Sequence, residues 1–135
     1  MEILSMFRSL VPSVVCALVV TSAVAAQERA PAEGSPAEAF EARVQEGMAY
    51  NVFRAQVLSA GWTASGDEDC ARAQGADLCE ALPELDACSS DGYCLMTFVH
   101  PDEDVVLRVA TYGDILRWRT PGEEADVAVS NWGYE

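Results

Sequence analysis

The sequence has no lysine, and its only histidine is His100. Its eight basic residues are all arginines, and they face 22 acidic residues, so the formal net charge is -14. Without lysine, the chain cannot form a Schiff base, and it lacks the phosphate-binding lysine of a P-loop. A strongly acidic protein is also repelled by the phosphate backbone of nucleic acids. The composition therefore excludes lysine-dependent catalysis and argues against a nucleic-acid partner.

Catalytic arrangements are equally scarce. His100 lies beside Pro101 at a predicted hairpin bend, and no serine or cysteine nucleophile motif accompanies it. A catalytic histidine usually needs a positioned nucleophile or an orienting carboxylate. We therefore interpret His100 as a solvated turn residue, and we expect no catalytic residue, no cofactor and no enzymatic activity.

Two acidic runs, residues 67–69 and 102–104, both read Asp-Glu-Asp. Calcium binds six to eight oxygen ligands, and paired carboxylates can hydrolyse glycosidic bonds. Neither run has the spacing of an EF-hand loop, and adjacent acids in a loop are usually hydrated. We predict no metal site and keep an ion-binding or hydrolytic role of these runs as an alternative.

Residues 1–26 have the features of a secretory signal peptide, because Arg8 precedes an apolar stretch at residues 10–20 and small residues follow. Cleavage before Ala26 and cleavage before Gln27 both fit, with Gln27 slightly favoured. A retained membrane anchor is the alternative, but a span needs about 20 apolar residues. We expect a periplasmic or secreted protein that does not bind membranes after cleavage, since anionic lipids repel acidic surfaces.

The chain after the predicted cleavage site keeps four cysteines: Cys70, Cys79, Cys88 and Cys94. An even number in an exported chain is typical of disulfides. Their spacing contains no C-x2-C pair, which structural zinc sites usually have, so disulfides are favoured over zinc. Four cysteines allow three pairings. We favour Cys70 with Cys79 and Cys88 with Cys94, because sequence-local pairs need no distant contacts.

Helix signals come first along the domain. Ser35 and Glu38 have the spacing of a capping box, and apolar residues then recur at helical spacing. We predict one long helix over residues 36–60, with a weak point at Gly47. Gly61 supplies the stop signal.

Strand signals follow. Residues 93–100 and 105–112 are rich in β-branched and aromatic residues and flank a Pro-Asp-Glu-Asp turn, which predicts a hairpin. Its more apolar face, which contains Met96, Phe98, Leu107 and Val109, should pack on the helix. Shorter strands are predicted near residues 62–64 and 126–132, with an irregular stapled region between residues 65 and 92.

The predicted fold is α+β: one long N-terminal helix packed on a small antiparallel sheet of three or four strands, stapled by disulfides. We expect a flexible leader at residues 27–36 and a single domain at residues 37–135. Nothing in the sequence indicates an oligomeric state.

The Gly61-Trp62 junction, the four cysteines and the segment from Phe98 to Thr111 together resemble small exported proteins of Gram-negative bacteria. The likeness covers about residues 49–113. No activity or catalytic residue is assigned in that group. The resemblance therefore implies an envelope location and a disulfide-bearing domain.

We expect most of the large aromatic residues to fill the core, because a small domain must bury such groups to be stable. These residues are Trp62, Tyr112, Trp118, Trp132 and Tyr134. Trp118 differs because it lies between Arg117 and Arg119 in a predicted loop, and Trp and Arg are enriched at interfaces. We therefore select Arg117, Trp118 and Arg119 as candidate interface residues.

Three functions follow from these features. The leading one is an acidic, non-enzymatic interaction domain whose partner is another envelope or extracellular protein. A narrower alternative is an inhibitor of a basic extracellular enzyme such as lysozyme, because complementary charge speeds association. The third is a hydrolase or ion-binding protein that uses the acidic loops.

Overall fold

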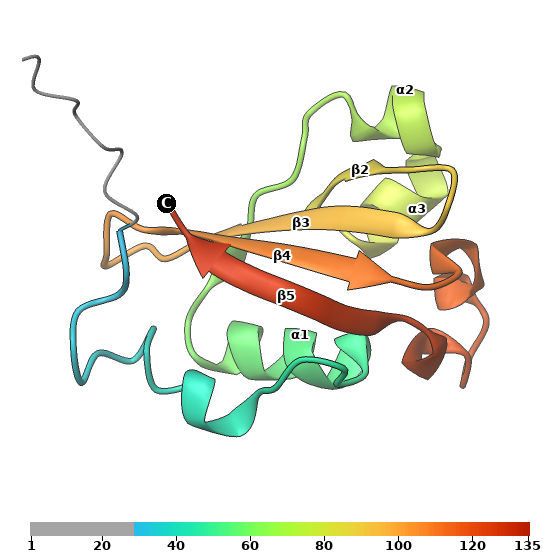
Figure 1. Cartoon of the computed structure of the whole chain (residues 1–135). Helices are drawn as coiled ribbons and strands as arrows, with labels where there is room; N and C mark the ends of the chain where they lie inside the picture. The colour runs from blue at the N-terminus through green and yellow to red at the C-terminus, as the bar shows by residue number, and fades with distance from the viewer. Residues whose placement is uncertain (1–28) are drawn as a thin grey trace, which may run out of the picture.

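The computed structural model describes residues 29–135, and it is an α+β fold built on five antiparallel strands (Figure 1). The predicted signal peptide at residues 1–26 lies outside the described residues. β3 is central: β4 and then β5 follow on one side, while β1 and β2 both pair with β3 on the other. The strands are β1 (Thr63–Ala64), β2 (Leu85–Cys88), β3 (Tyr93–Val99), β4 (Val106–Tyr112) and β5 (Ala128–Tyr134).

The predicted hairpin is confirmed as β3 and β4, whose register runs from Tyr93 opposite Tyr112 to Val99 opposite Val106. Successive side chains of a strand point to opposite faces of the sheet. One face, the inner face, is apolar, as the alternation predicted, and its centre is fully buried. Its central residues are Met96, Phe98, Leu107 and Val109.

α1 (Tyr50–Ser59) packs on the inner face and buries Tyr50, Phe53 and Val57 there (Figure 1). The other helices are short and lie at the ends of the strands. They are α2 (Cys70–Gln74), α3 (Ala76–Ala81) and the 3-10 helices η1 (Glu41–Arg43), η2 (Ile115–Arg119) and η3 (Glu124–Asp126). None of the helices between residues 29 and 135 is long and apolar enough to cross a membrane.

The prediction of one long helix over residues 36–60 is wrong, although the capping residues at its predicted start do form their hydrogen bonds. The Glu38 N–H donates to Ser35 Oγ at 3.1 Å, and the Glu38 carboxylate accepts from the Gly34 N–H at 2.5 Å. This cap starts only turns and η1, and the chain is extended again at Val44. The capping box therefore starts a short helical segment that ends before Val44, and it does not start a long helix.

Hydrogen bonds to the sheet explain the break. The N–H of Gly47, at φ +80°, donates to the Val129 carbonyl at 2.7 Å, and the Tyr50 N–H donates to the Val127 carbonyl at 2.7 Å. Residues 47–50 therefore cover part of the open edge of β5. A continuous helix would have to give up these tertiary hydrogen bonds, so α1 begins only at Tyr50.

The end of α1 agrees with its predicted stop signal. Gly61 has φ +93°, and its N–H donates to the Leu58 carbonyl at 3.1 Å. The Trp62 N–H then donates to the Val57 carbonyl at 3.3 Å. This pattern satisfies the last carbonyls of a helix and needs a residue that tolerates positive φ.

Both favoured disulfides are present. Cys70–Cys79 joins α2 to α3, and Cys88–Cys94 joins β2 to β3. Disulfides persist in oxidising compartments, so the pairs indicate an extracellular or periplasmic environment. The region predicted to be irregular contains β2, which sequence analysis missed and which brings the number of strands to five.

Candidate binding surface

The sheet face opposite α1, here called the outer face, carries exposed side chains. Tyr93 and Tyr112 lie directly opposite each other on β3 and β4, with ring centroids 4.8 Å apart. Both rings and the neighbouring Leu95 are about half exposed, at 51%, 52% and 50%. The same two strands that bury one face therefore present an open aromatic pair on the other.

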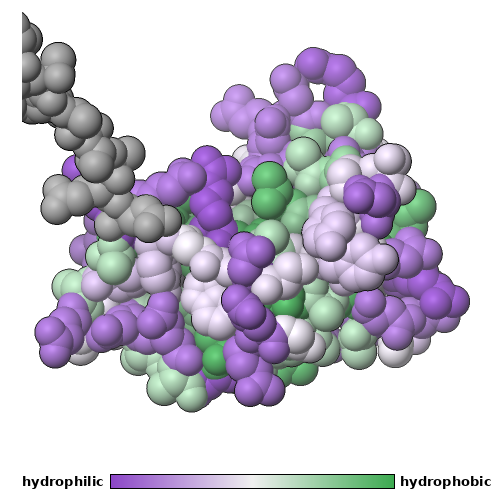
Figure 2. All heavy atoms as spheres, in the orientation of Figure 1, coloured by the Kyte–Doolittle hydropathy of each residue, from purple (hydrophilic) through white to green (hydrophobic). Residues whose placement is uncertain are grey.

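Three of the six large exposed apolar residues in the described chain lie on the outer face, and a fourth, Leu116 in η2, lines a pocket together with Tyr112. Exposed apolar residues that gather in one place mark interaction sites, whereas isolated ones need no explanation. In the space-filling view, apolar and pale residues lie over the strands with hydrophilic residues around them (Figure 2). We call the set Tyr93, Leu95, Tyr112 and Leu116 the outer patch.

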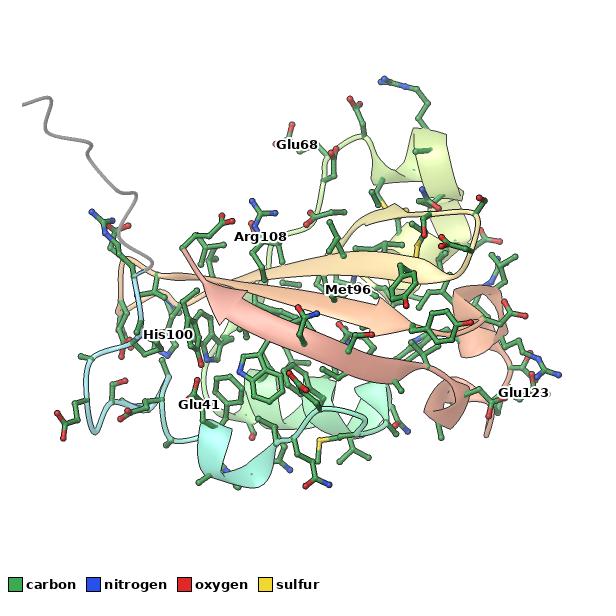
Figure 3. The ribbon with its side chains drawn as sticks, viewed as in Figure 1. Glu41, Glu68, Met96, His100, Arg108 and Glu123 are labelled. Atoms are coloured by element: carbon green, nitrogen blue, oxygen red, sulfur yellow. A yellow bond between two sulfur atoms is a disulfide. The ribbon has the colours of Figure 1, made fainter. Side chains whose placement is uncertain are left out.

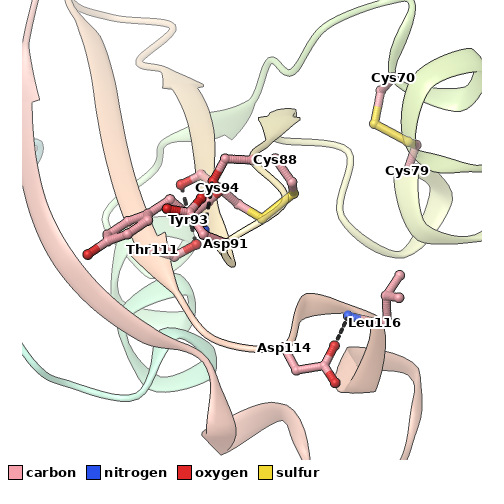
Figure 4. Close-up of a disulfide and its surroundings, with 10 residues drawn as sticks. Cys70, Cys79, Cys88, Asp91, Tyr93, Cys94, Thr111, Asp114 and Leu116 are labelled. Carbon is pink, nitrogen blue, oxygen red and sulfur yellow. Dashed lines mark hydrogen bonds between the residues drawn. A yellow bond between two sulfur atoms is a disulfide. The ribbon is translucent and has the colours of Figure 1, made fainter.

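A cavity of about 730 Å³ adjoins the outer patch at the end of the sheet. Figure 4 shows several of the residues that line it, among them Asp91 and Asp114. We call it the end pocket. It lies between the β2–β3 turn at residues 89–92 and the segment at residues 113–116 that follows β4, and the Cys88–Cys94 disulfide lines it. Tyr112 and Leu116 belong to both the pocket and the patch.

The end pocket has an acidic lining. Asp91 and Asp114 line it, and none of the residues that line it is basic. Asp91 accepts a hydrogen bond from the Ser89 hydroxyl, and Asp114 Oδ1 accepts one from the Leu116 N–H at 3.2 Å. Neither aspartate forms an ion pair with an arginine of the described chain.

Elsewhere, the arginines are neutralised by carboxylates. On the outer face, Arg108 donates to Asp86 at 3.2 Å and to Glu135 at 3.1 Å (Figure 3). Six of the seven arginines between residues 29 and 135 form such pairs: Arg29, Arg54, Arg72, Arg108, Arg117 and Arg119. The unneutralised charge of the surface is therefore mainly negative.

The candidate interface residues Arg117, Trp118 and Arg119 lie in η2 rather than in the predicted loop. The Trp118 ring packs against the core, 5.3 Å from the Tyr50 ring. The two arginines make separate ion pairs with Glu123 and Asp126 and with Asp77. All three side chains thus have contacts within the chain, and their role as an interface stays a prediction.

His100 is buried, with 6% exposure, so its interpretation as a solvated turn residue is wrong (Figure 3). Its Nε2 lies 3.2 Å from the Ala60 carbonyl, and its Nδ1 lies 3.2 Å from the Asp102 N–H. A Cβ on Gly61 would lie 3.1 Å from Nε2, so the glycine leaves room for the ring. The imidazole joins the β3–β4 turn to the end of α1.

The two acidic runs make local contacts. Asp69 pairs with Arg72 at 2.8 Å, and Asp104 pairs with Arg29 at 2.5 Å. Within residues 29–135, no group of three or more His, Cys, Asp or Glu side chains is arranged to hold a metal ion. The runs therefore do not combine into one site in the described part of the chain.

A buried polar network lies on the α1 side of the sheet. Glu84 is fully buried and accepts hydrogen bonds from the Tyr50 hydroxyl, at 2.9 Å, and from Arg54 through Nε and Nη2. Burial raises the pKa of Tyr50 well above its usual value, and the charge of Glu84 raises it further. Burial lowers the pKa of Arg54, but its contacts with Glu84 outweigh this effect and the net shift is upward. The network fastens α1 to the start of β2.

Comparison with protein-family models, curated proteins and solved structures finds no significant match to this chain. The outer face must therefore be interpreted from its own chemistry. Sequence analysis missed Tyr93 and Leu95, although strand alternation already placed them on the other face of the strand from Met96 and Phe98. It had no signal for the pocket aspartates, because the cavity forms where the β2–β3 turn, the segment after β4 and the end of α2 meet.

Proposed function

We propose that the protein is an exported, non-enzymatic interaction domain of the bacterial envelope whose outer face binds a basic partner protein. The observation that carries this proposal is the half-exposed Tyr93–Tyr112 pair beside a cavity that holds two carboxylates and no basic group. A cross-strand aromatic pair stabilises a sheet by about 0.2–1 kcal/mol, which does not require the two rings to be left half exposed. Exposure of the pair is therefore better explained by binding.

The chemistry of this surface favours a cationic partner. Tyrosine supplies a large contact area with little loss of conformational freedom, and its ring face attracts Arg and Lys side chains. The net charge of -14 would also steer a basic protein toward the domain during diffusional encounter. The tyrosine rings and the net charge both favour a basic partner. Steering by the net charge weakens as salt screens the charges.

Export is supported by the two disulfides and by the predicted signal peptide. The envelope location rests on the resemblance to small exported proteins of Gram-negative bacteria. Inhibition of a basic extracellular enzyme such as lysozyme is the narrower form of the same proposal. The separate positions of the two acidic runs offer no comparable support for a hydrolase.

Binding of basic proteins tests the proposal. The mature protein, purified from the periplasm, would be titrated with lysozyme and with cytochrome c at low and high salt. We expect saturable binding that weakens with salt and is reduced at least tenfold by the combined change Tyr93→Ala/Tyr112→Ala, a loss of about 1.4 kcal/mol.

The double variant Val52→Ala/Leu58→Ala is the matched control, because these residues are also exposed apolar side chains but lie on α1. It should bind both proteins as tightly as the wild type. Equal losses in the two double variants would contradict the assignment to the outer face. Absence of binding to either basic protein at low salt would overturn the proposed function.

A further inference from the structure

We infer that the end pocket receives an arginine or lysine side chain presented by the basic partner. This inference rests on the proposed function and deepens it, because it names the chemical group that is recognised and the residues that recognise it. Asp91 and Asp114 would bind the cationic head, while Tyr112 and Leu116 would contact its aliphatic stem.

The walls of the cavity suit such a group, and its volume leaves ample room for one. Its volume of about 730 Å³ lies in the usual range for ligand sites, which combine apolar walls with a few polar groups. Tyr112, Leu116 and the Cys88–Cys94 disulfide provide apolar surface. The half-exposed Tyr112 ring can also attract a cation through its π-face.

The two carboxylates provide the charge. Asp91 comes from the β2–β3 turn and Asp114 from the segment after β4, so they approach the cavity from different parts of the chain. Their hydrogen bonds come from a hydroxyl and a backbone N–H, which leave the negative charge of each in place. Both aspartates are exposed, so water screens them, and their contribution is two accessible anionic acceptors for a guanidinium or ammonium group.

The pocket is held in shape before any ligand arrives. The Gly113 N–H donates to the Gly92 carbonyl at 3.1 Å, which joins its two rims. Both glycines have positive φ, and a Cβ on Gly113 would lie 2.5 Å from the Asp126 carbonyl oxygen. The Cys88–Cys94 disulfide fixes the strands beneath the turn. A preorganised site binds more tightly, because less ordering is needed on association.

The neighbouring patch favours a side chain over a free cation. Tyr112 is shared between the pocket and the outer patch, and its ring contacts that of Tyr93. A polypeptide could thus lie across Tyr93 and Leu95 while one of its basic side chains enters the pocket. A small free cation would leave these exposed residues uncovered.

Peptide binding to the mature protein tests the inference. The probe is acetyl-Gly-Arg-Gly-amide, followed by NMR through the backbone amides of Gly92 and Gly113. Its control is the same peptide with citrulline, which has nearly the shape of arginine without the charge. We expect saturable shifts with the arginine peptide and binding at least tenfold weaker with the citrulline peptide.

Two protein variants locate the site. Asp91→Asn/Asp114→Asn removes two charges but keeps an acceptor oxygen for Ser89 and for the Leu116 N–H, so the fold should persist. Glu46→Gln/Glu80→Gln removes two charges from exposed positions outside the pocket and is the matched control. We expect at least a tenfold loss of arginine-peptide binding in the first variant and less than a twofold loss in the second.

Three results would overturn the inference: equal binding of both peptides, equal losses in both variants, or tighter binding of free spermidine than of the arginine peptide. Lysozyme binding separates this failure from that of the proposed function. Suppose that Asp91→Asn/Asp114→Asn binds lysozyme normally while Tyr93→Ala/Tyr112→Ala does not. The inference about the end pocket is then wrong, and the proposal that the outer face binds a basic protein is retained.

Discussion

The two faces of the sheet differ in how far their side chains are buried. On the inner face, Met96 and Phe98 of β3 are fully buried beneath α1, whereas Tyr93 and Leu95 on the outer face are half exposed. These four residues belong to a single strand of seven residues. One set of side chains of the strand thus lies in the core, while Tyr93 and Leu95 of the other set remain on the surface.

The ionic groups follow the same division. The inner pair of Arg54 and Glu84 is largely buried, with side-chain exposures of 25% and 0%. On the outer face, the Arg108 and Glu135 side chains are 46% and 62% exposed. Burial decides how much each contact contributes, because water screens exposed pairs and cannot solvate a buried charge. Stability should therefore depend on the inner face and binding on the outer face.

Truncation of one residue on each face is the strongest test of this division. Phe98→Ala should lower the free energy of unfolding by about 3–5 kcal/mol, because it removes buried apolar surface and leaves a cavity. Leu95→Ala should change it by about 0.5 kcal/mol or less, because its side chain is half exposed. Urea denaturation measures both values. Similar losses in the two variants would show that the outer face also supports the fold.

The ion pairs provide a second, smaller contrast. Glu84→Gln should destabilise the protein by about 3 kcal/mol, at the lower end for breaking a buried pair, because Arg54 keeps some contact with water. Its matched control, Glu135→Gln, should cost about 0.5 kcal/mol or less. Thermal and urea unfolding of the two variants would provide the comparison. A cost below about 1 kcal/mol for Glu84→Gln would contradict the structural role given to the network.

Raising the pH above about 10 should lower the free energy of unfolding less than either substitution in the inner face. An unfolded tyrosine loses its proton near pH 10, whereas burial and Glu84 keep the pKa of Tyr50 above this value in the folded state. Stability is therefore fully present below about pH 10 and falls as the pH rises further, by up to about 1.4 kcal/mol per pH unit for one proton. Burial and Glu41 also raise the pKa of Tyr134, so this residue likewise lowers stability as the pH rises.

Urea unfolding between pH 8 and pH 11 would measure this slope. Tyr50→Phe should make the decline shallower without abolishing it, because Tyr134 still contributes. An unchanged slope in the Tyr50→Phe variant would show that the Tyr50–Glu84 contact does not govern alkaline unfolding.

The sequence by itself determined the features that depend on neighbouring residues. Strand alternation fixed which residues of β3 and β4 face the core, and Gly61 ended α1 because few other residues adopt its positive φ. The disulfides joined cysteines only nine and six residues apart. In each case, the deciding geometry (side-chain alternation, a backbone torsion or a short loop) is set by residues close together along the chain, so a local pattern was enough.

Only the tertiary structure decided the rest. Residues 47–50 form hydrogen bonds with β5 in place of the predicted long helix. The short β2 is part of the sheet because it pairs with β3. Glu84 meets its partners across 30 and 34 residues, and the end pocket needs two distant turns to meet. The sequence pattern does not show which remote segment a hydrogen bond or a buried side chain will meet, so these contacts appear only when the chain is folded.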